Sequence, residues 1–87
     1  MKIAATHERN PAIGWDIDTT VAADGHEAIR HVRIDVNGSP IADEDVPGVS
    51  SWHKLHVQKG QFPGENHLIV TVLDGDGNET SAIDEWQ

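Results

Sequence analysis

The chain has 87 residues, no cysteine and a formal net charge of −9. A chain of this length is expected to form a single domain over residues 1–87, with a modest hydrophobic core. The lack of cysteine excludes a small domain that depends on disulfides for its stability. The negative charge argues against binding to nucleic acid or to an anionic membrane, because phosphate groups would be repelled, and it favours divalent cations or a basic partner.

Nothing in the sequence predicts contact with the bilayer interior. No run of residues is long and apolar enough to span a membrane, so membrane insertion is not expected. The first residues, 1–8, contain one lysine and few apolar side chains and do not resemble a signal peptide. Either the protein is not exported by that route, or Met1 was added to a module taken from a longer chain.

The first half of the chain alternates between apolar and polar residues, as half-buried strands do. Residues 2–6 are compatible with a short first strand, and Asn10-Pro11 indicates a bend. The next two strands are predicted at residues 13–21 and 29–36, followed by Asn37-Gly38, the strongest two-residue hairpin signal. The inward positions expected for these two strands are Ile13, Trp15, Ile17, Thr19, Val21, Val32, Ile34 and Val36.

The second half continues the pattern. Residues 40–47 begin and end with proline and are acidic between, which predicts at best a short edge strand. A strand is predicted at 51–58, then a turn at 59–66 with Phe62 as a buried hook. A strand from residue 67 to 73, a turn at 74–78 and a last strand at 79–86 complete the chain. The inward positions expected here are Leu55, Val57, Leu68, Val70 and Val72.

About seven short strands with frequent turns predict an all-β fold, a single antiparallel β-sandwich. No helix is expected beyond one turn at residues 26–30. The segment Gly64-Glu65-Asn66-His67-Leu68-Ile69-Val70-Thr71-Val72-Leu73-Asp74-Gly75-Asp76-Gly77-Asn78 resembles the "G-x-N-x-I-x-V-x-V-x-D-x-x-G-N" stretch of bacterial immunoglobulin-like and fibronectin-type-III-like modules. Asp24-Gly25 and the strand through Asn37-Gly38 resemble the same modules. Trp15 stands where many of them place a core tryptophan, and the resemblance covers about residues 13–83.

The resemblance implies a role in contacts and not in catalysis. Such modules serve as spacers and adhesive units on bacterial surfaces, as accessory domains beside carbohydrate-active enzymes, and as decorations on phage particles. It therefore implies a place outside the cell, on a bacterial surface or on a virion. The chain lacks tyrosine, so the tyrosine corner of some sandwich families is absent.

One motif in the turn after residue 73 has the chemistry of a cation site. Its oxygen-bearing residues follow the spacing 1, 3, 5, 7 and 12 of a calcium loop: Asp74, Asp76, Asn78, Thr80 and Glu85. The sixth position is Glu79 where such loops have glycine, and no helix flanks it. A hairpin turn needs these residue types for backbone reasons alone. Two interpretations stay open: a plain turn, or a calcium site formed by Asp74, Asp76 and Asn78, with Asp24 as a further ligand.

Other candidate residues are aromatic or histidine side chains. Trp52 and His56 are the candidate partner-binding residues; for Trp52 the alternatives are an exposed contact or the core edge. His53 and His56 would point to opposite faces of a strand, so zinc is not expected. No nucleophile motif is present, and an enzyme is not expected.

These observations predict a non-enzymatic module that presents a surface to a protein or glycan partner, as a monomer or as part of a larger assembly. Addition of a partner strand to an edge strand is the simplest mode. The alternatives are a calcium-dependent carbohydrate-binding or adhesin accessory domain and an inert spacer. No cofactor is required, and calcium is the one candidate.

Overall fold

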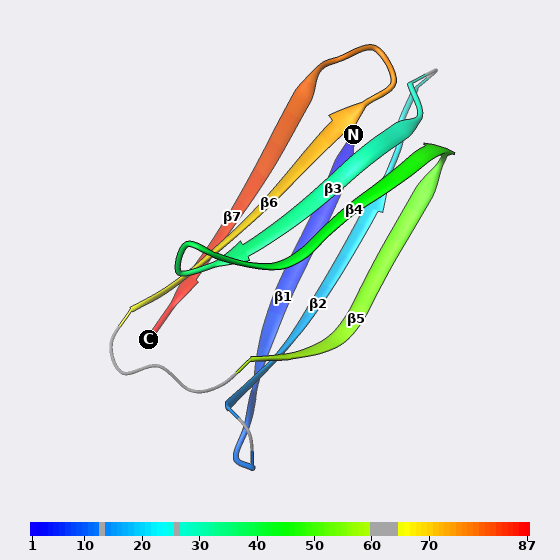
Figure 1. The fold of residues 1–87 in the computed structure, drawn as a ribbon. Coiled ribbons are helices and arrows are strands. Elements are labelled where there is room, and N and C mark those ends of the chain that lie inside the picture. Colours follow the sequence, from blue (N-terminus) through cyan, green and yellow to red (C-terminus); the bar gives the residue numbers. More distant parts are fainter. Residues whose placement is uncertain (13, 26, 60–64) are drawn as a thin grey trace.

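The structure, a computed structural model, describes residues 1–12, 14–25, 27–59 and 65–87, with the side chains of 55–59 left out of the description. Within these ranges seven strands pair antiparallel in two sheets that pack face to face (Figure 1). The strands are β1 (Lys2–Asn10), β2 (Gly14–Ala22), β3 (Ile29–Val36), β4 (Ser39–Val49), β5 (Ser51–Lys59), β6 (Asn66–Asp74) and β7 (Glu79–Trp86). One sheet has the order β1-β2-β5 and the other β4-β3-β6-β7. The predicted all-β sandwich is confirmed.

The core lies between the sheets and is built by alternation along the central strands. In β2 and β6 every second side chain is shielded from water, and all of these but Thr19, Asn66 and Asp74 are apolar. In β3 a register shift after Ile29 interrupts the alternation, which resumes at Val32. The burial of the apolar side chains is the main favourable term in folding. The fully buried apolar residues are Ile17, Val21, Ile29, Val32, Ile34, Val36, Leu68, Val70 and Val72. The inward positions predicted on β2, β3 and β6 are thus confirmed. Ile13, Phe62 and the side chains of Leu55 and Val57 lie outside the described residues.

The predicted hairpin at Asn37-Gly38 joins β3 to β4. Asn37 has φ 52° and Gly38 has φ 81°, the pair of positive φ angles that a two-residue type I′ turn requires. The Asn37 N–H donates to the His67 carbonyl oxygen at 2.8 Å, and the Asn37 Oδ1 accepts from the His67 N–H at 2.8 Å. The turn is therefore tied to the start of β6 as well as to its own strands.

β1 and β4 are several residues longer than predicted. β1 has nine residues and pairs with β2 along its whole length, from Lys2 opposite Ala22 to Asn10 opposite Gly14. β4 has eleven residues, although only a short strand was expected between the two prolines. It is an edge strand, as predicted, and register shifts in its pairing with β3 accommodate residues that cannot continue a regular ladder.

Of the single helical turn considered at residues 26–30, residue 26 lies outside the described residues, and residues 27–30 form no helix, because Ile29 already begins β3. No helix capable of crossing a membrane occurs in the part of the chain that the structure describes.

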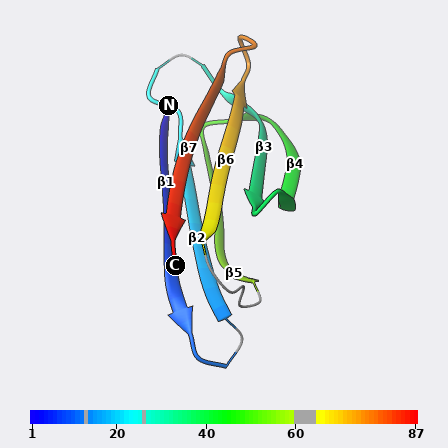
Figure 2. The same cartoon turned by 90° about the vertical axis from the view of Figure 1, so that its left-hand side faces the viewer.

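A polar contact bridges the two sheets at each open side of the sandwich. On one side β1 lies beside β7 (Figure 2), and His7 Nδ1 lies 2.6 Å from Asp84 Oδ2. On the other side Lys54 Nζ of β5 lies 3.2 Å from Glu44 Oε2 of β4. These four side chains point inward from their strands, at the border between the apolar core and the solvent.

Candidate interaction surface

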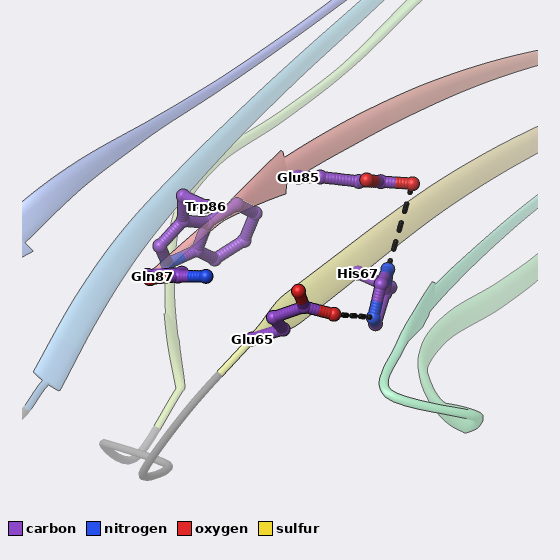
Figure 3. A pocket seen from close by; sticks show the side chains of 5 residues that line it. All are labelled: Glu65, His67, Glu85, Trp86 and Gln87. Atoms are coloured by element: carbon purple, nitrogen blue, oxygen red, sulfur yellow. Dashed lines mark ion pairs between the residues drawn. The ribbon is translucent and has the colours of Figure 1, made fainter.

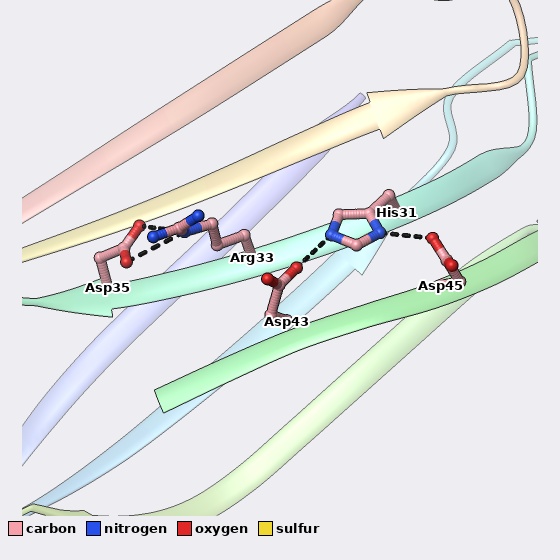
Figure 4. A network of polar contacts seen from close by, with 5 residues as sticks. All are labelled: His31, Arg33, Asp35, Asp43 and Asp45. Carbon is pink, nitrogen blue, oxygen red and sulfur yellow. Dashed lines mark hydrogen bonds and ion pairs between the residues drawn. The ribbon is translucent and has the colours of Figure 1, made fainter. Parts of the chain in front are cut away.

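The outer face of the four-stranded sheet has a charged half on β3 and β4 and an apolar half on β6 and β7. On the charged half, the ring of His31 lies between two aspartates of β4 (Figure 4). Its Nδ1 is 2.6 Å from Asp45 Oδ1, and its Nε2 contacts Asp43 Oδ1. A neutral imidazole has a single N–H, so donating to both carboxylates requires the imidazolium form. Asp45 first, and Asp43 second, raise the pKa of His31 above its usual value of 6.5.

Arg33 extends this charged half along β3. Its Nε donates to both oxygens of Asp35, at 3.1 and 3.0 Å. Two cations, His31 and Arg33, therefore face three carboxylates, and each carboxylate has a cationic partner within the sheet. The two aspartates of His31 approach opposite sides of one ring, so the three groups do not converge on a common point as metal ligands would.

The apolar half centres on Ile69 of β6 and Ile83 of β7. The register places these residues directly opposite each other, and their exposed fractions are 38% and 66%. Thr71 and the half-buried Leu73 continue the same face of β6. Isolated exposed isoleucines are ordinary, but two paired across neighbouring strands form a contiguous patch at the rim of the sheet.

A cavity of about 200 Å³ adjoins this patch (Figure 3). Its lining residues are Glu65, His67, Glu85, Trp86 and Gln87. His67 is opposite Glu85 in the register, one outward row beyond the isoleucine pair. The His67 ring lies between two carboxylates, with Nε2 3.5 Å from Glu65 Oε2 and Nδ1 3.5 Å from Glu85 Oε1. The lining thus combines two acids, an imidazole and an aromatic ring, and no hydroxyl or thiol nucleophile.

β7 forms the rim of the sheet next to this cavity. Among the described strands it pairs with β6 alone, so its other edge presents backbone N–H and C=O groups. The opposite rim, β4, has Pro40, Pro47 and a run of acids, which are the residues that block strand addition. β7 contains no proline and exposes Ile83, so it is the better edge for a partner strand.

A cluster of three rings supports β7 from inside. The His7 ring stacks on Trp86 with centroids 4.2 Å apart and planes 10° apart. Trp15 of β2 meets both rings edge to face, at 5.7 Å from His7 and 5.5 Å from Trp86. Trp86 therefore has two roles: it anchors the end of β7 between the sheets and forms one wall of the cavity.

A second, wider hollow of about 700 Å³ lies over the ends of β1 and β2. Small side chains such as Ala4, Thr20 and Ala22 form much of it, and Lys2 and His53 flank them. Its surface is large, but few of its polar groups converge on one point, as a specific small-molecule site requires.

The candidate calcium ligands lie in a turn whose residues form hydrogen bonds with one another. Asp74 is buried, and its Oδ1 accepts hydrogen bonds from the N–H groups of Asp76 and Asn78, both at 2.9 Å. The Asp74 N–H donates to the Asn78 carbonyl at 2.9 Å. Asp24, the further ligand considered, is paired with the Met1 ammonium, which lowers its pKa. Across residues 1–12, 14–25, 27–59 and 65–87, no group of three or more His, Asp or Glu side chains is arranged to hold a metal ion.

Of the two candidate partner-binding residues, the structure describes the side chain of Trp52 only. Trp52 is 8% exposed and belongs to the core cluster, so of the two alternatives the core edge is correct and the exposed contact is wrong. Its indole faces the sheet opposite, because it is paired with Val21 on the inward row of β2. The side chain of His56 lies outside the described residues.

The sequence interpretation missed the cavity between β6 and β7. The available signal was that four residues all fall on outward positions of their strands: His67, Ile69, Ile83 and Glu85.

Comparison with known proteins adds no further assignment: no protein-family model matches the chain, and searches of curated proteins and of solved structures find no significant match.

Proposed function

We propose that the chain is a non-enzymatic module, of the immunoglobulin-like or fibronectin-type-III-like kind, that binds a protein partner through β7 and the outer face of β6 and β7. The observation that carries the proposal is the exposed pair Ile69 and Ile83 at an edge without proline. Apolar side chains at an unpaired strand edge are costly in an isolated domain, because they invite association. A strand bound at β7 would lie beside Ile83, and Ile69 lies one strand further in, on β6.

Seven antiparallel strands in two facing sheets support the family part of the proposal, because immunoglobulin-like sandwiches share this architecture without all sharing one strand order. In an immunoglobulin constant domain the fourth strand belongs to the sheet of the first, second and fifth strands. Here β4 has moved to the other sheet beside β3, a variation found within sandwiches of this general kind. By analogy with such modules, the place of action would be a bacterial surface or a virus particle, where the module displays β7 to its partner.

Strand addition is the mode of binding that fits this edge. A partner segment aligned beside β7 would pair with its free backbone groups, and this pairing gives affinity without a deep pocket. Side chains of the added strand that share the outer face would then lie beside Ile83 and its neighbours along β7, and these contacts would provide specificity.

The test is selection of short random peptides displayed on phage against the immobilised full chain, with counter-selection on an Ile69→Thr/Ile83→Thr variant. Threonine keeps strand propensity while it removes the apolar patch. The matched control is Val49→Thr, since Val49 is also an exposed apolar side chain, 37% exposed, but lies on β4. Amide NMR spectra of the variants establish that they remain folded.

The proposal expects peptides that bind the wild type and the Val49→Thr chain and lose at least about tenfold in affinity for the double variant, the effect of about 1.4 kcal/mol of lost burial. Selected peptides that bind all three chains equally would place the binding surface elsewhere. A selection that enriches nothing would favour the inert spacer.

A further inference from the structure

We infer that the partner segment of β7 carries a lysine or arginine two residues from an apolar residue, and that the cavity between Glu65 and Glu85 receives its cationic group. This inference rests on the proposed function and deepens it, because it names the chemistry of the partner. Three observations on the described residues carry it: the charge of the cavity, its aromatic wall, and its position one outward row from the isoleucine pair.

The charge of the cavity is negative whatever the state of its histidine. Glu65 and Glu85 contribute two carboxylates, and His67 adds at most one positive charge between them. Each carboxylate is about two-thirds exposed and 3.5 Å from the imidazole, longer than a strong charge-assisted hydrogen bond. Both therefore keep lone pairs that can accept hydrogen bonds from an ammonium or guanidinium group.

Trp86 makes the cavity more than an acidic cluster. Its ring lines the site, and stacking on His7 and contact with Trp15 hold that ring in place. The apolar stem of a lysine or arginine packs along such a ring, and an indole also attracts a nearby cation. A carboxylate pair beside an ordered tryptophan thus suits a long basic side chain better than it suits a small inorganic cation.

The position of the cavity determines how far apart the apolar and the basic residue must lie in the partner segment. Two residues along each strand separate the pair His67 and Glu85 from the pair Ile69 and Ile83, a distance of about 6.8 Å. An extended peptide places its own residues i and i+2 on one face at the same spacing. A peptide strand with its apolar side chain beside Ile83 therefore has the next outward side chain beside Glu85.

The aspartates of the charged half are a poorer target for the same cation. Asp43 and Asp45 are already engaged by His31, and Asp35 by Arg33. A partner would have to displace an internal cation to reach them. The net charge of −9 would nonetheless attract a basic segment to the molecule as a whole.

The test measures binding of a defined peptide to the full isotopically labelled chain by amide NMR titration. The peptide has about nine residues, a common strand length, with one isoleucine and one lysine two positions apart in a background of threonine. Its matched control replaces the lysine by norleucine, which keeps the stem and removes the charge. The protein variants are Glu65→Gln/Glu85→Gln for the cavity and Asp43→Asn on the charged half as control.

The inference expects shifts along β7 and at His67, and binding of the lysine peptide that is about threefold to tenfold tighter than that of the norleucine peptide. The difference should vanish in the Glu65→Gln/Glu85→Gln chain and persist in Asp43→Asn. High salt should reduce it, because the site is exposed.

Equal affinity for the two peptides would overturn the cationic pocket while leaving strand addition at β7 in place. A peptide that changes no amide NMR signal of β7 would also overturn the cationic pocket. The phage selection then tests the proposed function separately. Self-association of the chain through β7, seen by sedimentation without peptide and abolished by Ile83→Thr, would make a second copy the occupant and overturn the basic partner.

Discussion

His7 Nδ1 of β1 and Asp84 Oδ2 of β7 lie 2.6 Å apart across the gap between the two sheets. The pair is partly shielded, with side-chain exposures of 30% and 25%, and the His7 ring also stacks on Trp86. β1 and β7 share no ladder, since they are the rims of different sheets. This contact therefore fixes the end of the strand that we propose as the binding edge.

We predict that Asp84→Asn lowers the free energy of unfolding by about 1 kcal/mol, the typical net value of one hydrogen bond. The amide keeps the shape of the carboxylate and loses its charge and half of its acceptor capacity. Urea denaturation provides the measurement. Asp76→Asn is the control, because Asp76 is an exposed acid in the β6–β7 turn, and it should change stability little. Equal stabilities of the two variants would show that the link between the sheets contributes nothing.

The central strands could be predicted because their signal is local. Each second residue from Leu68 to Val72 is apolar, so the inward face follows from the sequence without knowledge of the partner strand. The extension of β1 beyond residue 6 could not be predicted in this way. Residues 7–10 lead into the bend signal at Asn10-Pro11 and have little strand pattern of their own, and they are held extended by pairing with β2, which is a tertiary effect.

The candidate sites were harder to predict, because they depend on register. A regular two-residue hairpin at Asn37-Gly38 would place His31 opposite Glu44. The register shift between Ile34 and Asp35 moves the pairing by one residue and brings Asp45 opposite His31. No turn signal in the sequence predicts this irregularity in the pairing of β3 and β4. The cavity at His67 likewise depends on the pairing with Glu85, which lies across the β6–β7 hairpin.

The burial of Trp52 leads to a second prediction. Trp52→Ala should destabilise the domain by about 3 kcal/mol or more, as for other buried aromatic residues, while Trp52→Phe should cost less because it leaves a smaller cavity. Thermal or urea unfolding gives both values. The exposed-contact interpretation predicts instead that Trp52→Ala leaves stability unchanged and weakens partner binding alone.

The β6–β7 turn provides a third prediction, on the role of Asp74. Asp74→Ala removes the acceptor of two backbone N–H groups and should cost about 1–2 kcal/mol. Asp76→Ala should cost little, because in the structure the side chain of Asp76 is exposed and it is its backbone N–H that takes part in the turn. Urea unfolding of the two variants measures the difference.

Calcium distinguishes the two interpretations of the same turn. Because Asp74 Oδ1 already accepts two N–H groups, we expect the melting temperature of the wild type to be the same in EDTA and in millimolar calcium. A rise with calcium that Asp74→Asn abolishes would favour the calcium site over the plain turn.

The fifth prediction concerns the pH dependence that His31 confers. Its pKa in the folded chain is raised by Asp45 and Asp43, whereas the unfolded value is near 6.5. A raised pKa means that the folded state binds the proton more tightly, so the contribution of His31 to stability is complete below about pH 6.5 and is lost as the pH rises through the folded pKa. Below about pH 4 the aspartates themselves become protonated, so the useful window lies above about pH 5.

The measurement compares the wild type with His31→Gln by urea unfolding between about pH 5 and pH 9. The wild type should be the more stable near pH 5.5, and its advantage should shrink toward pH 9. In parallel, NMR titration of the His31 ring protons should give a pKa above 6.5 that returns toward 6.5 in Asp43→Asn/Asp45→Asn. A His31 pKa that does not respond to removal of both carboxylates would mean that the ring is not held between them in solution, and the charged half would then have acidic groups free for a basic partner.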